Sequence, residues 1–149
     1  MVTEPGADNP IRAARGRMKG DDPARVGATD KRESFMNLHD SRGRRAAENQ
    51  SVFRSINEHI GELNESWDYL SPLGGSWVCE CTQLDCTETV RMTPSEYRDV
   101  RADPTHFVVA PADAHVVAEV ERVIGRNDRY WIVEKLGAAA ERAEELNPR

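Results

Sequence analysis

Three cysteines lie within eight residues of one another, in the stretch VCECTQLDC. They are Cys79, Cys81 and Cys86, with the spacing C-x-C-x4-C. Thiolates are strong ligands for zinc and for iron–sulfur clusters. An odd number of cysteines in so short a stretch suits a metal or redox cluster better than a disulfide framework. Polar neighbours argue against a third interpretation, in which the cysteines are small buried hydrophobic residues.

Zinc is the ion that this spacing favours, because C-x-C-x4-C does not match the usual cluster-binding patterns of iron–sulfur proteins. A tetrahedral zinc site needs a fourth ligand, which is often a histidine. His59 falls among the polar positions of a predicted helix and is expected at the surface. His106 opens a predicted strand, and His115 follows that strand in the loop PADAH. Spacing alone leaves both His106 and His115 open.

The elements around the cysteines predict how they are positioned. SWVCEC and TETVRM have β-favouring residues with partial alternation, which indicates a hairpin closed by residues 82–86, with the cysteines at its tip. Thr93, Pro94 and Glu96 form an N-terminal helix signature for PSEYRDVRAD. HFVVA and RYWIVEK predict strands, AHVVAEVERVI a short helix or a strand, and AAAERAEEL a helix. We therefore expect an α+β fold with a small, mostly antiparallel sheet and short helices.

A longer amphipathic helix is predicted before the hairpin, from Arg45 onwards. Its apolar residues recur every three or four positions and are Phe53, Ile56, Ile60, Leu63 and Trp67. About 20 residues of helix would be about 30 Å long. This face could pack on the domain's own sheet, or it could bind a protein partner or a second copy in a coiled-coil-like seam.

The composition divides the chain of 149 residues into two regions. Residues 1–44 hold nine basic and seven acidic side chains, whereas residues 45–149 hold eleven basic and nineteen acidic ones. The first region has few apolar residues without helical or strand periodicity, so we expect a disordered extension over 1–43 and a zinc-binding domain over 44–149. Met36, close to this boundary, is an alternative start site. The acidic balance of the domain argues against a nucleic-acid partner.

The chain lacks the sequence features of a membrane-inserted or secreted protein. No stretch approaches the roughly 18 to 20 apolar residues of a spanning helix, and no apolar run follows the basic residues near the N-terminus. A cytoplasmic location is the expectation that follows.

Several segments together resemble a family of short, uncharacterised actinobacterial proteins. The similarity lies in RRAAENQSVFRSINEHIGELNE, in VCEC-x4-C, in RMTPSEYRDVRADPTHFVVAP, and in VERV followed by RYWIVEK, so it covers roughly residues 44–149. In that family a Pro-Gly-His-Glu step follows the strand, and its histidine corresponds to His115. The resemblance thus implies His115 as the fourth ligand, although this chain has PADAH instead, without the glycine and glutamate.

A site with four protein ligands leaves no open position for a reacting water, which argues for structural zinc and against hydrolysis. No phosphate-binding glycine loop, nucleophile elbow or H-E-x-x-H motif is present. Glu80, Asp85 and Glu88 are candidate bases by proximity only. We expect a small zinc-binding interaction or regulatory module. The alternatives are a thiol-based redox sensor, because zinc thiolates can be oxidised, and, with less support, a metal-dependent hydrolase.

Overall fold

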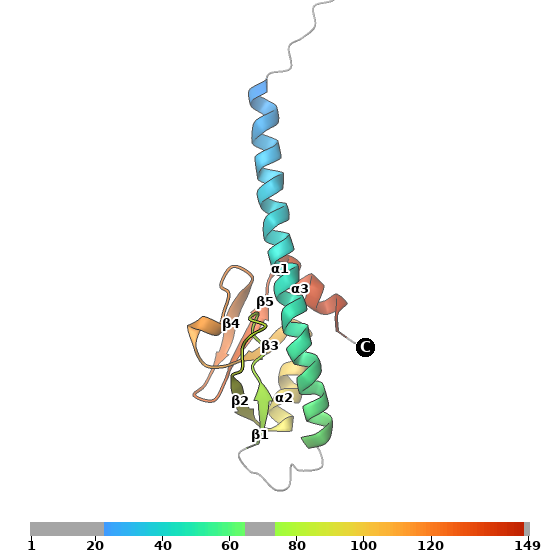
Figure 1. Cartoon of the computed structure of the whole chain (residues 1–149), viewed down its shortest axis with the longest axis vertical. Coiled ribbons are helices and arrows are strands. Elements are labelled where there is room, and N and C mark those ends of the chain that lie inside the picture. The colour runs from blue at the N-terminus through green and yellow to red at the C-terminus, as the bar shows by residue number, and fades with distance from the viewer. Residues whose placement is uncertain (1–22, 65–73, 148–149) are drawn as a thin grey trace, which may run out of the picture.

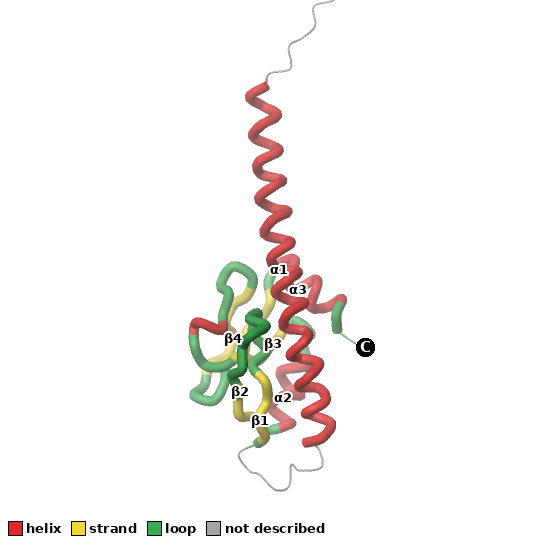
Figure 2. The backbone as a smooth tube through the Cα atoms, in the orientation of Figure 1, coloured by secondary structure: helices red, strands yellow, loops and turns green. Residues whose placement is uncertain are grey.

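The computed structural model describes residues 23–64 and 74–147, which form an α+β fold (Figures 1 and 2). In chain order the elements are α1 (Pro23–Asn64), β1 (Gly75–Val78), β2 (Thr89–Met92), α2 (Pro94–Arg101), β3 (His106–Val109), the short 3-10 helix η1 (Asp113–His115), β4 (Glu121–Arg126), β5 (Trp131–Lys135) and α3 (Gly137–Glu145). The predicted fold class is confirmed: a long N-terminal helix accompanies antiparallel strands and short helices.

The strands form two small sheets in the described part of the chain, where the sequence predicted one. β1 pairs with β2 as an antiparallel hairpin, and the second sheet has the antiparallel order β3-β5-β4. β4 carries an irregularity between Val123 and Gly125. Of residues 114–124, for which a helix or a strand was predicted, only 121–124 lie in a strand, because β4 begins at Glu121; the residues before it belong to the end of η1 and to a turn.

Helix α2 begins as its sequence signature predicts. The Thr93 side chain accepts a hydrogen bond from the Glu96 amide, and the Glu96 carboxylate accepts one from the Thr93 amide, with Pro94 in the first turn. This reciprocal capping satisfies amides that have no partner within the helix. Tyr97 and Val100 are buried, as expected. Tyr97 stacks on Trp77 of β1, with ring centroids 4.2 Å apart, so α2 closes one side of the core.

The buried face of α1 differs from the predicted stripe. Phe53 is buried and Ile60 is partly buried, but Ile56 and Leu63 are exposed, and Trp67 lies outside the described residues. The face that packs on the domain is instead made of Ala46, Ala47, Gln50, Phe53, Arg54 and Asn57. Three of these six residues are polar, so an analysis of apolar periodicity could not find this face.

Hydrogen bonds explain why polar residues of α1 are buried. Gln50 donates to the carboxylate of Glu121 (3.2 Å), which also forms a 2.6 Å ion pair with Lys135. Both partners of that ion pair are fully buried. Arg54 donates to the backbone oxygens of Pro104 and His106. A buried ion pair is tolerated only when its polar atoms are satisfied in this way.

Helix α1 is also longer than predicted, at 42 residues or about 63 Å. It begins at Pro23, and its N-terminal part extends beyond the strands and the other helices (Figure 1). Residues 31–42 are all exposed, and packing begins at Gly43, where an added Cβ would lie 3.2 Å from the Ala139 nitrogen. The domain boundary at residue 44 stays a prediction, with α1 running across it. No helix within 23–64 or 74–147 is long and apolar enough to span a membrane.

Candidate metal centre

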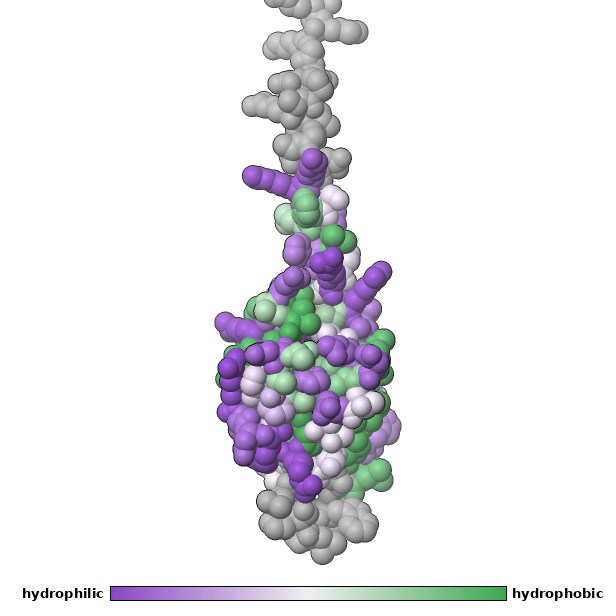
Figure 3. All heavy atoms as spheres, turned by 60° about the vertical axis from the view of Figure 1, so that its left-hand side comes forward, coloured by the Kyte–Doolittle hydropathy of each residue, from purple (hydrophilic) through white to green (hydrophobic). Residues whose placement is uncertain are grey.

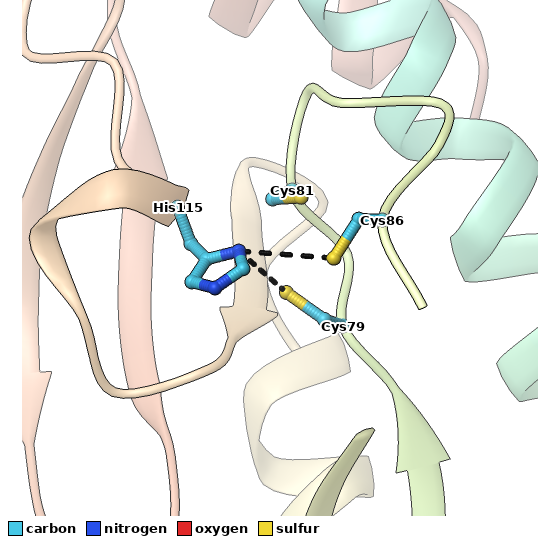
Figure 4. A group of neighbouring side chains, drawn as sticks. All are labelled: Cys79, Cys81, Cys86 and His115. Atoms are coloured by element: carbon cyan, nitrogen blue, oxygen red, sulfur yellow. Dashed lines mark hydrogen bonds between the residues drawn. The ribbon is translucent and has the colours of Figure 1, made fainter. Parts of the chain in front are cut away.

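The three cysteines lie in the loop that connects β1 and β2. Cys79 and Cys81 directly follow β1, and Cys86 precedes β2. The amide of Cys79 donates to the Glu88 oxygen (3.0 Å), which extends the hairpin ladder by one step. In extended backbone, residues i and i+2 point to the same side. The C-x-C spacing therefore directs both sulfurs to one side, while the loop brings Cys86 back to meet them (Figure 4).

His115 completes the group and comes from the segment between β3 and β4, two strands of the other sheet. It is the last residue of η1, and its ring faces the sulfurs (Figure 4). Its Nδ1 lies 3.7 Å from the Sγ of Cys79 and 3.7 Å from the Sγ of Cys86. The four potential ligand atoms of Cys79, Cys81, Cys86 and His115 all lie within 4.8 Å of one another. The cysteines and the histidine that the sequence singled out are thus brought together.

These distances fit a tetrahedral zinc ion. Bonds of about 2.3 Å to sulfur and about 2.0 Å to nitrogen place a ligating sulfur and nitrogen about 3.5 Å apart at the tetrahedral angle. The observed 3.7 Å between Nδ1 and two sulfurs is close to that value. The donor set also fits, since three sulfurs and one imidazole are a common set for structural zinc.

The two other histidines considered lie elsewhere. His106 opens β3, as predicted, and its Nε2 is 3.7 Å from an oxygen of Asp103. His59 is exposed on α1, also as predicted, and its Nδ1 lies 2.8 Å from the backbone oxygen of Ser55. Neither belongs to the group around the sulfurs.

Several polar residues hold the loops around the cluster in place. Gln83 donates to the Ala114 oxygen (2.9 Å), which ties the cysteine loop to the residue preceding His115. Asn49 of α1 donates to the Thr82 oxygen (3.0 Å). The Ala110 amide donates to the Cys79 sulfur (3.2 Å), a contact that favours the thiolate. The roles of Asn49 and Gln83 were not predicted, because nothing in the residue pattern indicates a bond to a distant backbone oxygen.

Glu80 lies between two cysteines, but its side chain belongs to a different environment. It is fully buried and accepts hydrogen bonds from the Tyr97 hydroxyl (2.7 Å), Asn57 (3.0 Å) and the Val108 amide (3.1 Å). Its own amide donates to the Val108 oxygen (2.7 Å). Glu80 therefore joins the cysteine segment to α1, α2 and β3. With its carboxylate occupied by these donors, it is poorly placed to act as the general base considered above.

Hydrogen bonding and burial give the three thiols different acidities. A hydrogen bond with Cys79 lowers the pKa of Cys81 to about 5, and a hydrogen bond with His115 acts in the same direction. The same contact with Cys81, together with burial, raises the pKa of Cys79, and burial raises the pKa of Cys86. Without a cation, deprotonation of Cys81 is favoured, whereas deprotonation of Cys79 and of Cys86 is disfavoured. A bound divalent cation would favour deprotonation of all three.

Comparison with models of protein families, with curated proteins and with solved structures found no match. The resemblance to the actinobacterial family therefore stays a prediction. The cluster of Cys79, Cys81, Cys86 and His115 is consistent with the motif on which that resemblance depends.

Proposed function

We propose that this protein binds one zinc ion through Cys79, Cys81, Cys86 and His115, and that the ion is structural. The observation that carries the proposal is the convergence of four zinc-binding atoms within 4.8 Å, from segments separated by 29 residues between Cys86 and His115. An ion held there would join the β1–β2 hairpin to the loop after β3. Because this site would form only in the folded chain, metal binding would add directly to folding free energy.

The proposed role of this domain is binding rather than catalysis. Four protein ligands would fill a tetrahedral coordination shell and leave no position for a reacting water. Exposed apolar residues on α1, among them Phe35 and Leu38, support a protein partner or self-association as the function of the long helix. Three free cysteines suit a reducing compartment, which is why we propose a cytoplasmic location.

A redox-sensing role is the second candidate, favoured by the position of Cys86. Cys79 and Cys81 are buried, whereas Cys86 is partly exposed and so offers an oxidant access to the cluster. Peroxide would oxidise two thiolates to a disulfide, be reduced to water, and release the metal. Release of zinc by peroxide from the folded protein, reversed by a thiol reductant, would support this role. Thiols that resist peroxide until the chain is denatured would contradict it.

Elemental analysis of histidine variants tests the zinc proposal most directly. Protein purified without added metal should carry about one zinc per chain. His115→Ala should lower zinc affinity by about tenfold or more, whereas His106→Ala, a matched control, should keep the wild-type zinc content. Cys81→Ser should lose the metal and destabilise the fold. Metal-free, folded wild-type protein, or equal zinc affinity in both histidine variants, would overturn the assignment.

A further inference from the structure

Of the six large apolar side chains described as exposed on α1, all except Met36 form a stripe with its own period. They are Phe35 (64% exposed), Leu38 (51%), Val52 (53%), Ile56 (44%) and Leu63 (70%). The stripe positions between them, at the same alternating steps of three and four, are occupied by Arg42, Arg45, Asn49 and His59. The mean step of 3.5 residues is the period of a coiled-coil seam. We call these nine positions the α1 seam.

The α1 seam has two parts in different surroundings. Phe35 and Leu38 lie on the projecting segment, within the fully exposed residues 31–42 (Figure 3 shows apolar, green, residues there among hydrophilic ones). Val52 and Ile56 lie beside the domain, where with Leu146 they line an open, mainly apolar groove of about 510 Å³. One part is thus a ridge of apolar side chains on a helix, and the other is a groove that such a ridge would fill.

The two parts cannot meet within one chain. Leu38 and Ile56 belong to a single continuous helix and are 18 residues apart, which corresponds to about 27 Å along its axis. An isolated projecting helix of this kind gains little stability in water without a packing partner. The ridge of one molecule can therefore reach a groove only on a second molecule.

Charge determines the orientation in which a second copy fits. In a parallel pair in register, Arg42 and Arg45 would each lie opposite the same residue of the second copy, which places like charges together. In an antiparallel pair, a seam position that is followed by a step of three residues faces a position that is followed by a step of four. Arg45 then lies opposite Asn49 of the second copy, whose amide nitrogen is bonded to Thr82 of its own domain. Glu48 of that copy, which pairs with its own Arg142, lies beside the seam. In this orientation no seam arginine lies directly opposite another arginine.

The same antiparallel register matches the apolar ends. It places Leu38 opposite Ile56 of the second copy and Arg42 opposite Val52, so that the aliphatic stem of the arginine covers an apolar side chain. Phe35 then lies opposite His59 of the second copy, at the end of that copy's groove. Because both copies contribute both parts, the contact is repeated by a twofold axis, as in most homodimers.

We propose that two copies of this chain associate through antiparallel α1 helices, each inserting Phe35 and Leu38 beside Val52 and Ile56 of the other. The inference names the partner of the proposed binding module, and it rests on that function because zinc would hold the domain that forms the groove. The axis passes close to Ala47, whose buried side chain faces its own domain.

Sedimentation of the full-length chain, with zinc measured on the same sample, tests the pairing. The wild type should have twice the mass of one chain. Leu38→Glu and Ile56→Glu should each weaken the dimer by about tenfold or more. Met36→Glu is the matched control: Met36 is 67% exposed on the same segment but lies outside the seam, so this variant should stay dimeric.

Cross-linking gives the orientation. A photo-activatable leucine at position 38 should link to peptides containing residues 52–56 of the second copy. Links to position 38 itself would indicate a parallel pair and overturn the proposal, as would a dimer that survives both Leu38→Glu and Ile56→Glu. A monomeric wild type carrying one zinc would overturn the pairing and leave the zinc proposal intact. A seam-dependent dimer without zinc would support the pairing and contradict the zinc proposal.

Discussion

Glu80 shows how a single residue can link a candidate metal site to the core. In the segment Cys79-Glu80-Cys81, alternation of an extended backbone points the two sulfurs one way and the carboxylate the other. The carboxylate is buried and satisfied by donors from α1, α2 and β3. The orientation of the two sulfurs is therefore fixed by contacts on the opposite side of the backbone. Burial, with the nearby Glu80 charge, also raises the pKa of Tyr97, which keeps its hydroxyl a hydrogen-bond donor.

Replacing Glu80 with glutamine tests this link. The amide that replaces one carboxylate oxygen cannot accept a hydrogen bond, so at least one of the three donors to Glu80 loses its partner. We expect the free energy of unfolding to fall by about 1–3 kcal/mol and zinc affinity to fall by about ten- to a hundredfold. Urea denaturation and competition with a chelator measure the two effects.

Glu88→Gln is the control for this substitution, because Glu88 is exposed and lies two residues beyond Cys86. It should change neither quantity appreciably. If Glu80→Gln retained wild-type zinc affinity despite a loss of stability, Glu80 would be a core residue that does not position the sulfurs.

The residues of the site were predictable to different degrees. The cysteine cluster followed from chemistry and spacing alone, because C-x-C in a hairpin places two sulfurs on one side. Choosing between His106 and His115 required the family resemblance, since sequence spacing carries no information about how η1 folds back. Asn49 and Gln83 could not be predicted, because their partners are backbone oxygens distant in sequence.

At the scale of elements, α1 shows where periodicity fails as a guide. Apolar spacing correctly predicted a helix here, but it assigned Ile56 and Leu63 to the same face as the buried Phe53. The buried face includes Gln50, Arg54 and Asn57 because each donates a hydrogen bond to the domain, Gln50 to the Glu121 carboxylate and the other two to backbone oxygens. Burial lowers the pKa of Arg54 to about 10, which still leaves it charged at neutral pH. The helix has an apolar stripe on the outside and a partly polar face inside.

The start of α2 carries a charge pair that gives a pH prediction. The Glu96 carboxylate binds Arg129 from the β4–β5 turn (2.5 and 3.0 Å) and caps α2, and the hydrogen bond from Arg129 lowers the pKa of Glu96 to about 2. Because the folded-state pKa lies below the ordinary value of 4.5, the pair stabilises the fold fully above pH 4.5. This contribution is lost as pH falls from about 4.5 towards 2.

Carbon-13 NMR of the Glu96 carboxyl group between pH 7 and pH 4 measures this directly. The signal should hardly move in the wild type, because Glu96 stays ionised throughout that range. In Arg129→Gln it should begin to shift near pH 5, as the pKa rises towards the ordinary value. A wild-type signal that titrates with a midpoint near 4.5 would show that the pair does not stabilise α2 in solution.

For the whole molecule, the α+β class was predictable because strand, turn and capping signals agreed along the chain. The division into two sheets was not, because contacts between residues distant in sequence arrange the strands, such as the bonds of Glu80 with the Val108 backbone that connect the cysteine segment to β3. With few aromatic residues, the core relies on Trp77, Tyr97 and Phe107 together with buried polar contacts. A metal ion at one end of this core would add to a modest amount of hydrophobic burial.

The exposure of α1 predicts where the self-sufficient domain begins. Among the residues that a chain starting at Gly43 lacks, 31–42 are all exposed, so their side chains contribute nothing to the core. This shortened chain keeps the contacts between α1 and α3, including the ion pair of Arg44 with Glu145 (3.2 Å). We expect it to fold, to bind zinc as the full chain does, and to be monomeric. At concentrations where the full chain is also monomeric, its free energy of unfolding should change by less than about 1 kcal/mol.

A chain starting at residue 51 is the matched control, because it also lacks Ala47 and Gln50, both fully buried, and leaves the Glu121–Lys135 pair without its donor from α1. Urea denaturation should show this shorter chain to be strongly destabilised or unfolded, with zinc lost. Loss of fold or metal already in the chain starting at Gly43 would mean that the projecting segment is part of the folding unit. The boundary at residue 44 would then be wrong, and the association of α1 with a second copy would be needed for stability rather than for recognition alone.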